Sequence, residues 1–222
     1  MADFTLVIGN KNYSTWSLRG WLIAKAAGIE FEEIVIPLDL PETQAAIRRY
    51  SPSGRVPVLL HRGLAVWDSL AIAEYLNELR PEAALWPAAV AARAHARAIS
   101  AEMHTGFADL RNNMPMNIRS SFPGRGLTTG VRADIERITS LWRDCRKRFA
   151  GATPDDPGFL FGKFTAADAM FAPVATRFRT YSITLDSDSD AYCTAVLNHP
   201  AMKEWTDAAK NEPWLIEAYE LK

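Results

Sequence analysis

The sequence predicts two units of different fold class, an α/β half followed by an all-helical half. Short β-rich runs alternate with helical stretches from Asp3 to about Arg80, and the pattern after Pro81 is helical. The chain has 222 residues, of which 48% are hydrophobic, so it can bury a substantial core without metals or disulfides. We expect residues 1–82 and 88–222 to form two domains.

Local patterns indicate each element of the first half. Runs rich in β-branched and aromatic residues predict strands, and apolar residues at helical spacing predict helices. We expect strands at 4–8, 31–36, 58–60 and 64–66 and helices at 14–27, 43–50 and 69–80. A βαβ crossover joins parallel strands, whereas a short turn joins antiparallel ones. The order βαβαββα therefore predicts a small mixed sheet flanked by helices.

Long amphipathic stripes are typical of the second half. An Ala-rich stripe begins at Pro87 and predicts one helix as far as Pro115, and a second stripe covers 131–149. Two further helices are expected at 165–180 and 200–210, and the acidic run 186–190 is interpreted as a loop. These stripes predict a helical bundle.

Composition and charge argue against several classes of function. Lys and Arg total 25 against 26 Asp and Glu, so a net charge of -1 leaves no field to attract nucleic acid or a membrane. Lys25, Arg93 and Arg97 interrupt the apolar runs well short of the ~20 residues of a spanning helix. The acidic amino terminus is unlike a secretory signal. Cys145 and Cys193 are too few for a disulfide framework, so a reducing cytoplasm is expected.

The first candidate motif, Asn12–Ser17, lies between the first strand and the first helix. Free backbone N–H groups and the helix dipole favour an anion at this position. Ser14 is therefore a candidate functional hydroxyl. Its alternative role is a plain N-cap, which is the commoner use of such a serine.

The second motif, Ser51–Leu59, places Pro57 at the start of a β-run. Proline cannot donate to a strand ladder, so we expect Pro57 at a strand start or edge, with Val56 extended before it. A cis Val56–Pro57 bond would present the backbone of Val56 to a peptide-like ligand. Only about 5–6% of X–Pro bonds are cis, so spacing alone does not predict one.

The third motif is the pair Asp68–Ser69, which opens the last helix of the first half. Either residue can cap that helix, and the same N–H groups could hold a ligand carboxylate. The Ser69 hydroxyl would add a hydrogen bond, and Asp68 would meet an amine. Capping alone explains the pair equally well.

Together and in this order, the three motifs resemble the soluble, cytosolic-type glutathione S-transferases, as a Ser-type bacterial member with some likeness to the zeta class. Ser51–Leu59 is similar to the family's N-P-x-G-[KR]-V-P-x-L stretch, and Asp68–Ser69 to its acid-serine pair. Phe159–Met170 looks like the family's buried capping box, and Leu197–Trp205 like its late helix. The resemblance implies a thioredoxin-like domain followed by a helical domain, the glutathione transferase fold.

The resemblance also implies that the first domain binds glutathione as a co-substrate. Val56 would pair its backbone with the cysteinyl part, Asp68 would hold the γ-glutamyl end, and Arg55 would reach the glycyl carboxylate or the tripeptide backbone. The implied glutathione-binding residues are Asn12, Tyr13, Arg55, Val56, Pro57, Asp68 and Ser69.

The implied chemistry needs a thiolate, because a thiol with an ordinary pKa of about 8.5 is a weak nucleophile at neutral pH. Ser14 is the first choice for the catalytic hydroxyl. Asn12, Tyr13 and Ser17 remain alternatives. Arg19 matches an arginine in the family's first helix, and counting back from it places the catalytic residue of some family members at position 12. None of these positions holds a cysteine, which favours conjugation or isomerisation over thiol transfer.

We expect the co-substrate pocket on the later helices. Arg111 and Arg177 stand out, because a charge on a core-facing helix needs an internal acid or an anionic substrate as its partner. The expected pocket residues are Met103, His104, Phe107, Arg111, Arg177 and Tyr181. The histidines show no metal-ligand spacing, so no metal is expected.

The sequence thus predicts an enzyme that stabilises the glutathione thiolate and adds it to a small hydrophobic electrophile, in detoxification, as a cytoplasmic homodimer. One alternative is a zeta-like, glutathione-dependent cis-trans isomerase of a dicarboxylic acid. Another is a non-catalytic binding protein on the same fold. Neither nucleic acid nor a membrane is expected as a partner.

Overall fold

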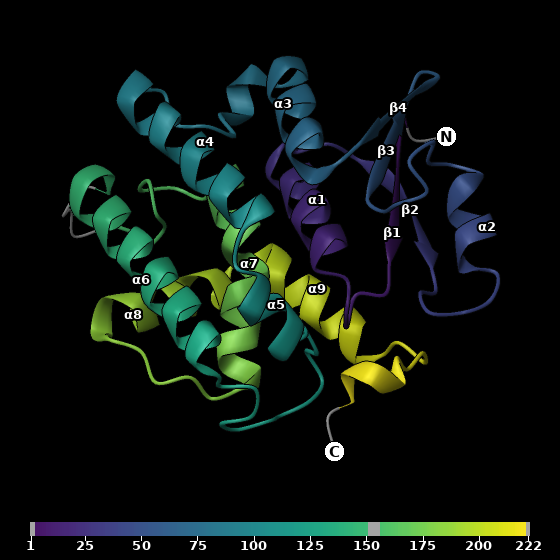
Figure 1. Cartoon of the computed structure of the whole chain (residues 1–222). Coiled ribbons are helices and arrows are strands. Elements are labelled where there is room, and N and C mark those ends of the chain that lie inside the picture. Colours follow the sequence, from purple (N-terminus) through teal and green to yellow (C-terminus); the bar gives the residue numbers. More distant parts are fainter. Residues whose placement is uncertain (1–2, 151–155, 221–222) are drawn as a thin grey trace.

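A computed structural model describes residues 3–150 and 156–220 and shows a mixed sheet beside a group of helices (Figure 1). The first half has the predicted βαβαββα order, and a series of helices follows it. The elements of the first half are β1 (Phe4–Gly9), α1 (Thr15–Ala26), β2 (Phe31–Ile36), α2 (Thr43–Arg48), β3 (Val58–His61), β4 (Leu64–Trp67) and α3 (Ser69–Leu79). The predicted fold class is confirmed.

β1 is an inner strand of a four-stranded sheet with the order β2-β1-β3-β4. It pairs in parallel with β2 and antiparallel with β3, where Leu6 lies opposite Leu59. β3 and β4 form a hairpin whose turn residues, Arg62 and Gly63, both have positive φ. This matches the backbone twist that tight hairpin turns require.

Different helices cover the two faces of the sheet. Alternate residues of a strand point to opposite faces, so Leu6 and Ile8 join the main core with α1 and α3. Val7 points the other way, into a smaller cluster with Ile36 and Ile47 under α2. In Figure 1, α1 and α3 lie between the sheet and the helical half, and α2 lies on the outer side. The loop before α1 is therefore at the junction of the two halves.

α7 forms the centre of the helical half. All of its residues except Arg179 are buried, and it contacts α1, α4 and α8. Side chains on α7 are thereby held in the interior. The elements of this half are η1 (Pro81–Ala83), α4 (Val90–Thr105), α5 (Ala108–Asn113), α6 (Thr129–Phe149), α7 (Ala166–Thr180), α8 (Ser187–Asn198), α9 (Pro200–Lys210) and η2 (Glu217–Tyr219).

The single helix predicted over 87–115 is two helices in the structure, α4 and α5. Gly106 is extended, and Phe107 has a φ of 62°, in the left-handed region. Glycine weakens a helix, and a left-handed residue ends it. The guanidinium of Arg111 then donates to the carbonyls of Gly106 and Met103, which satisfies the backbone at the break.

The acidic run 186–190, predicted as a loop, begins the helix α8. Asp186 is its N-cap: Oδ1 accepts the N–H of Ser189 at 3.0 Å, and Oδ2 accepts its hydroxyl at 2.8 Å. Asp188 and Asp190 lie in the first turn, where carboxylates suit the helix dipole. The composition that looked loop-like is thus a helix start.

The predicted capping box at the start of α7 is present. The backbone N–H and the hydroxyl of Thr165 both donate to Asp168 Oδ2 at 2.8 Å, and the N–H of Leu160 donates to Oδ1 at 3.0 Å. Burial raises the pKa of Asp168 to about 6, against the lowering effect of these hydrogen bonds. The box anchors the helix that carries Arg177.

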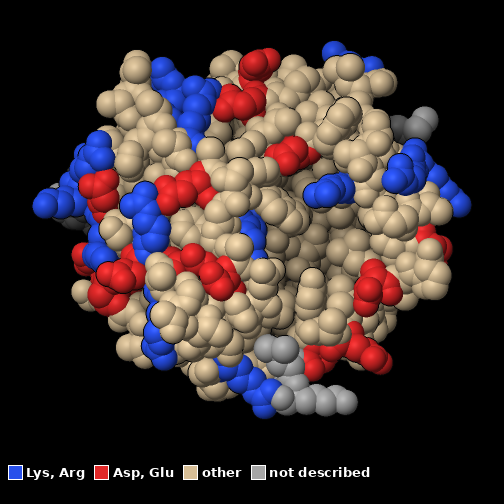
Figure 2. Space-filling model, in the orientation of Figure 1, with Lys and Arg blue, Asp and Glu red and all other residues tan. Residues whose placement is uncertain are grey.

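Charge is mixed over the surface. Figure 2 shows Lys and Arg interspersed with Asp and Glu around a hollow near the centre of the visible face. Across residues 3–150 and 156–220, no helix is both long enough and apolar enough to cross a membrane.

Candidate functional site

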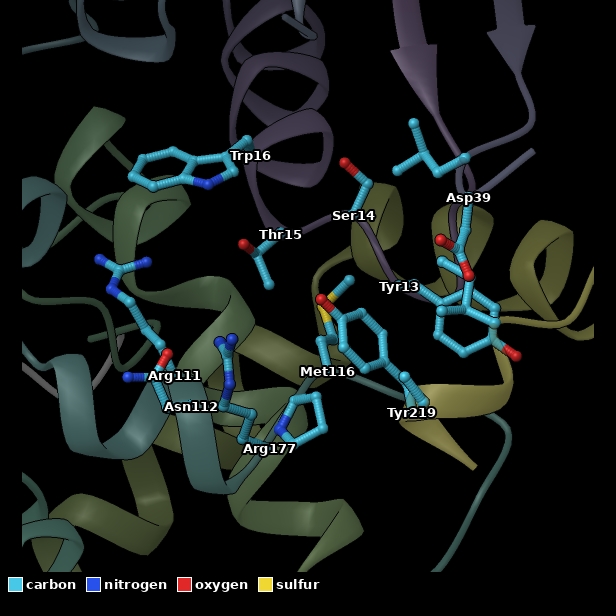
Figure 3. Close-up of a pocket in the computed structure, with 14 residues that line it drawn as sticks. Tyr13, Ser14, Thr15, Trp16, Asp39, Arg111, Asn112, Met116, Arg177 and Tyr219 are labelled. Atoms are coloured by element: carbon cyan, nitrogen blue, oxygen red, sulfur yellow. The ribbon is translucent and has the colours of Figure 1, made fainter. Parts of the chain in front are cut away.

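Two cavities lie at the junction of the halves, and Trp16 lines both. The Pro57 cavity, of about 260 Å³, is lined by Trp16, Ser53, Arg55, Val56, Pro57, Trp67, Asp68, Ser69 and His104. The arginine cavity, of about 480 Å³, is lined by Tyr13, Ser14, Thr15, Trp16, Leu38, Asp39, Arg111, Asn112, Pro115, Met116, Arg177, Ile216, Ala218 and Tyr219 (Figure 3). Five of the residues predicted to bind glutathione line the Pro57 cavity, Ser14 lines the arginine cavity, and Trp16 is common to both.

The Pro57 cavity is built mainly from residues 53–69, between β3 and the start of α3. The Val56–Pro57 peptide bond is cis. A Cβ added at Gly20 of α1 would lie 2.8 Å from Pro57 Cγ, so glycine permits α1 to pack closely against this loop. Five predicted glutathione-binding residues line this cavity: Arg55, Val56, Pro57, Asp68 and Ser69.

Asp68 and Ser69 lie at the start of α3, where the Asp68 backbone takes an unusual positive φ of 78°. Asp68 Oδ1 accepts the N–H of Leu70 at 3.0 Å and caps the helix. The Ser69 hydroxyl contacts Met170 Sδ at 3.8 Å, and sulfur is a weak acceptor. Both side chains thus keep polar capacity for a ligand.

His104, at the end of α4, reaches the Pro57 cavity from the helical half. We predicted it in the co-substrate pocket, and the structure places it at the other cavity. Its Nε2 is 3.2 Å from Asp68 Oδ2, and its ring lies edge-on to Trp16 at 4.9 Å. Burial lowers the pKa of His104, Asp68 opposes that shift, and the nearby Arg19 and Arg111 add to it.

Ser14 is the N-cap of α1 and lines the arginine cavity. Its Oγ donates to Ser17 Oγ at 2.7 Å and accepts the N–H of Ser17 at 3.3 Å. Ser17 Oγ also accepts the N–H of Gly9 at 2.9 Å. Ser17 is fully buried and lies behind Ser14, which makes it a support for the Ser14 hydroxyl.

The two other candidates for the thiol-activating group have structural partners. Asn12 is fully buried and lines neither cavity. Its Nδ2 donates a hydrogen bond to Asn117 Oδ1, and its Oδ1 accepts the backbone N–H of Arg119. The Tyr13 ring lines the arginine cavity, but its hydroxyl donates to Glu220 and accepts from Arg119. Burial and the bond to Glu220 raise the pKa of Tyr13, which disfavours its ionised form. Ser14 is the better placed hydroxyl.

Arg111 and Arg177, two of the residues predicted for the co-substrate pocket, both line the arginine cavity. Figure 3 shows their guanidinium groups directed to the same space, with Tyr219 and Asp39 across it. Arg177 is 3% exposed and donates to the carbonyls of Met114 and Pro173, at 2.6 and 3.2 Å. Burial lowers the pKa of Arg177 to about 10, and the charge of Arg111 contributes. Two cations held by carbonyls in this way favour an anionic ligand.

Trp16 is stacked between two guanidinium groups. Arg111 Cζ lies 5.0 Å and Arg19 Cζ 4.5 Å from the ring centroid. Arg19 is fully buried; its Nε donates to the Met170 carbonyl at 2.9 Å, and its Nη1 and Nη2 have no hydrogen-bond partner within the described residues. Cation–π contacts with Arg19 and Arg111 therefore help to fix the wall between the cavities.

The carboxyl-terminal tail closes the arginine cavity from the other side. Glu212 accepts the N–H groups of Lys11 and Asn12 at 2.7 and 2.9 Å, and Arg119 donates to the carbonyl of Trp214 at 2.8 Å. Ile216, Ala218 and Tyr219 then line the cavity. Burial raises the pKa of Glu212, more than its N–H bonds lower it.

Three predicted pocket residues lie outside both cavities. Met103, Phe107 and Tyr181 pack in the core, and the Tyr181 hydroxyl donates to the Pro115 carbonyl at 3.0 Å. Trp16 was not predicted, although its place two residues after Ser14 was a usable signal. Thr15, Asp39 and the tail residues were also missed. Within the described segments, no three His, Cys, Asp or Glu side chains are grouped to hold a metal ion.

Comparisons with known proteins agree with this architecture. The "Glutathione S-transferase, N-terminal domain" family model matches residues 13–79. A Burkholderia glutathione transferase homologue, solved with bound glutathione, has a TM-score of 0.70 at 22% identity and covers 96% of this chain and 100% of its own. A theta-class enzyme of Xanthomonas axonopodis, also with glutathione bound, has a TM-score of 0.65 at 21% identity, with 93% and 98% covered. These likenesses show a common fold.

Sequence relatives are closer over shorter stretches. A Caenorhabditis elegans protein named "Probable maleylacetoacetate isomerase" is 34% identical over 104 residues, 45% of this chain and 49% of its own length. The chain thus matches about half the length of that relative. An Aplysia californica "Probable glutathione transferase" is 35% identical over 82 residues, 37% of this chain and 87% of its own length. With the family model matching the same half that carries the Pro57 cavity, the chain belongs to the glutathione S-transferase family.

Proposed function

We propose that the protein is a glutathione transferase, which binds glutathione in the Pro57 cavity and adds its thiolate to a second substrate in the arginine cavity. The observation that carries this proposal is the shared wall. Five residues with the family's glutathione-binding pattern line one side, and Ser14 lines the other. A ligand at this wall can place a sulfur near Ser14 and a second molecule beside the arginines.

In this proposal Ser14 is the catalytic hydroxyl. Its hydroxyl donates a hydrogen bond to Ser17 Oγ in the structure. To stabilise a thiolate, that hydroxyl must rotate so that its hydrogen points at the sulfur. Ser17, held by the N–H of Gly9, can then donate to Ser14 Oγ and strengthen it as a donor. The N-terminus of α1 adds a favourable dipole. Val56, Asp68, Ser69 and Arg55 bind the tripeptide, and Asn12 supports the loop.

An ultraviolet difference titration of glutathione at neutral pH tests this role, because it reports binding and thiolate formation together. We expect a thiolate band in the wild type, a lost band with retained binding in Ser14→Ala, and a weakened band in Ser17→Ala. Thr15→Val is the matched control, since it removes the neighbouring hydroxyl of the same cavity and should keep the band. A band that survives Ser14→Ala would move the role elsewhere; absence of binding would contradict a transferase.

A second candidate is a glutathione-dependent cis-trans isomerase of a dicarboxylic acid. The inward-facing pair Arg111 and Arg177 favours it, and the nematode relative named as a maleylacetoacetate isomerase is consistent with it. Addition of the thiolate to a conjugated double bond leaves a single bond that can rotate. Expulsion of the same thiolate then restores the double bond, so glutathione is not consumed.

Product analysis separates the two candidates. With maleate and glutathione, an isomerase forms fumarate while free thiol stays constant; with chlorodinitrobenzene, a conjugating enzyme consumes thiol in proportion to product. Formation of fumarate that needs the arginines would favour the isomerase. Thiol consumption with the neutral electrophile alone would favour conjugation of hydrophobic compounds.

A cytoplasmic homodimer that acts in detoxification remains part of the proposal. The homodimer is supported by the exposed apolar side chains of Leu64 and Trp67, which both belong to the edge strand β4. Such residues are typical of an interface when they gather on one element. Light scattering on the wild type and on Leu64→Glu measures the oligomeric state; a monomeric wild type would contradict the dimer.

A further inference from the structure

His104 and Asp68 meet across the junction of the two halves. His104 comes from the end of α4, and Asp68 from the turn between β4 and α3. His104 Nε2 is 3.2 Å from Asp68 Oδ2, while Asp68 Oδ1 accepts the N–H of Leu70. The helix cap holds one carboxylate oxygen and the imidazole lies beside the other, so the surroundings of the carboxylate come from both halves.

The protonation state of His104 decides what the Asp68 carboxylate can bind. A neutral imidazole that turns its Nε2–H toward Oδ2 leaves further lone pairs on that oxygen for an ammonium group. A protonated imidazole instead brings a positive charge to the same carboxylate. It then competes with an incoming ammonium and repels it at close range.

We propose that His104 is a positioning residue for the γ-glutamyl amine of glutathione: in its neutral form it orients Asp68 toward that amine, and in its protonated form it excludes the amine. This inference rests on the proposed function. It adds a pH-dependent element to glutathione recognition that comes from the helical half, outside the contiguous binding motif.

The surroundings of His104 favour the neutral form in the free protein. Burial, with Arg19 of α1 and Arg111 of α5, lowers its pKa, and Asp68 alone raises it. The Trp16 and His104 rings are in edge contact, and Nδ1 is buried without a hydrogen-bond partner among the residues that the structure describes. The switch to the excluding form is therefore expected below about pH 6.5, the ordinary value for histidine.

The test measures binding of S-methylglutathione by calorimetry from pH 5 to pH 8. Its sulfur cannot ionise, its carboxyls titrate near pH 3.5 and its amine near pH 8, so the ligand is nearly constant between about pH 5 and 7. For the wild type we expect Kd to rise by up to about tenfold per pH unit below the His104 pKa. Buffers of different ionisation enthalpy should reveal proton release on binding in that range.

Three variants isolate the histidine. His104→Gln keeps a neutral donor toward Asp68, so it should bind within about threefold of the wild type at pH 7 and lose the proton release, since a single hydrogen bond is conserved. His104→Leu should weaken binding about tenfold at pH 7, as expected on losing a hydrogen bond to a charged group. When Asp68→Asn is already present, adding His104→Leu should weaken the binding of S-methylglutathione no further.

His95→Gln is the matched control. His95 lies on the same helix with similar exposure, 22% against 21%, and its Nε2 is 3.6 Å from Asp144 Oδ2, away from both cavities. It should keep the pH slope of the wild type. An unchanged slope in His104→Gln, or unchanged affinity in His104→Leu, would overturn this inference alone. A wild type that fails to bind S-methylglutathione would overturn the proposed function and this inference with it.

Discussion

The Pro57 cavity and the arginine cavity share Trp16 but are built in different ways. Apart from Trp16 and His104, the Pro57 cavity takes its lining from residues 53–69. The arginine cavity combines the loop before α1, the loop after β2, α5 and the segment after it, α7 and the tail. A contiguous motif can recognise one constant ligand, whereas a site assembled from distant segments can change with any of them. We infer that the first cavity sets what the family shares and the second sets what distinguishes this member.

The two cavities also differ in charge. The Pro57 cavity is lined by one acid, Asp68, beside the imidazole of His104, and by the exposed Arg55. In the arginine cavity, the guanidinium groups of Arg111 and Arg177 donate to backbone carbonyls. Carbonyls satisfy the hydrogen bonds of a guanidinium without neutralising its charge. The arginine cavity therefore keeps a net attraction for an anion.

The largest expected effect is that of Arg177→Met. With an anionic substrate such as maleate, kcat/KM should fall on the order of 10³-fold, because a buried charge loses its partner. Stability should fall by about 1–3 kcal/mol, because the Met114 and Pro173 carbonyls lose their donor. Steady-state kinetics with a melting curve checks both, and the affinity for glutathione should not change.

The control for this change is Arg179→Met, which removes the exposed arginine on the same helix. It should leave kinetics and stability near wild type. Equal losses for maleate and for neutral chlorodinitrobenzene in Arg177→Met would mean that the arginine is structural and that the two cavities do not differ as argued.

Asp68→Asn changes the Pro57 cavity and leaves the arginine cavity intact. It should raise the Kd of glutathione about 10- to 100-fold, the cost of a lost bond to a charged group, and leave the KM for the second substrate unchanged. Asparagine is as good an N-cap as aspartate, so the melting temperature should hold. Calorimetric titration measures the affinity. A matching change in the KM of the second substrate would show that the cavities are not separable.

Trp16→Leu should weaken ligand binding in both cavities, with a smaller effect in each than the two changes above. Loss of the indole removes its contacts with Arg19 and Arg111, each worth about 0.5–2 kcal/mol. Loss of contacts of this energy should weaken the binding of glutathione roughly tenfold, and the binding of an anionic second substrate by a similar factor. Trp16→Phe, which keeps an aromatic face, should recover part of both. Titrations of the two ligands measure both affinities. A change in the affinity of only one ligand would contradict a wall shared by the two cavities.

Glu212→Gln should have the smallest effect and should concern the arginine cavity. Because burial raises the pKa of Glu212, the folded state favours its protonated form. The wild type should then lose a little stability as the pH rises from about 4.3 through that raised pKa. Glutamine does not titrate, so the variant lacks this pH-dependent contribution. Its amide nitrogen also cannot accept one of the two N–H groups that Glu212 binds, so the variant should be less stable by a pH-independent amount. Melting temperatures of both proteins from pH 4 to pH 7 give the difference; parallel curves would argue against the assignment.

Local signals accounted for much of the fold and for one cavity. Strand runs and helix caps act within a few residues, so the βαβαββα order and the capping box at Thr165 were readable. Spacing alone did not predict the cis Val56–Pro57 bond that the structure contains. The failures were also local. Asp186 was interpreted as part of a loop although it begins a helix, and Gly106 divides a stripe whose apolar spacing continues across the break.

The arginine cavity was only partly readable, because helical spacing does not say which buried face meets a cavity. Met103, Phe107 and Arg111 follow one stripe, yet the bend at Phe107 turns Arg111 to the cavity and leaves the other two in the core. Tyr219 comes from a tail with no periodic signal. Hydrogen bonds from Arg119 to the Trp214 carbonyl and from Asn117 to the Tyr219 carbonyl bring it there.

Thus the order of the elements is a property of the chain that short-range physics makes legible: turn chemistry, capping and alternation of apolar residues. The family was identified in a different way, from the resemblance of short motifs to known sequences. The meeting of Ser14, Trp16, Arg111, Arg177 and the tail, and the reach of His104 to Asp68, arise from helix packing over separations of up to about two hundred residues. Such packing depends on the angles between helices and on the shapes of whole buried faces. No local pattern encodes these angles, so the chemistry of the second cavity belongs to the folded molecule.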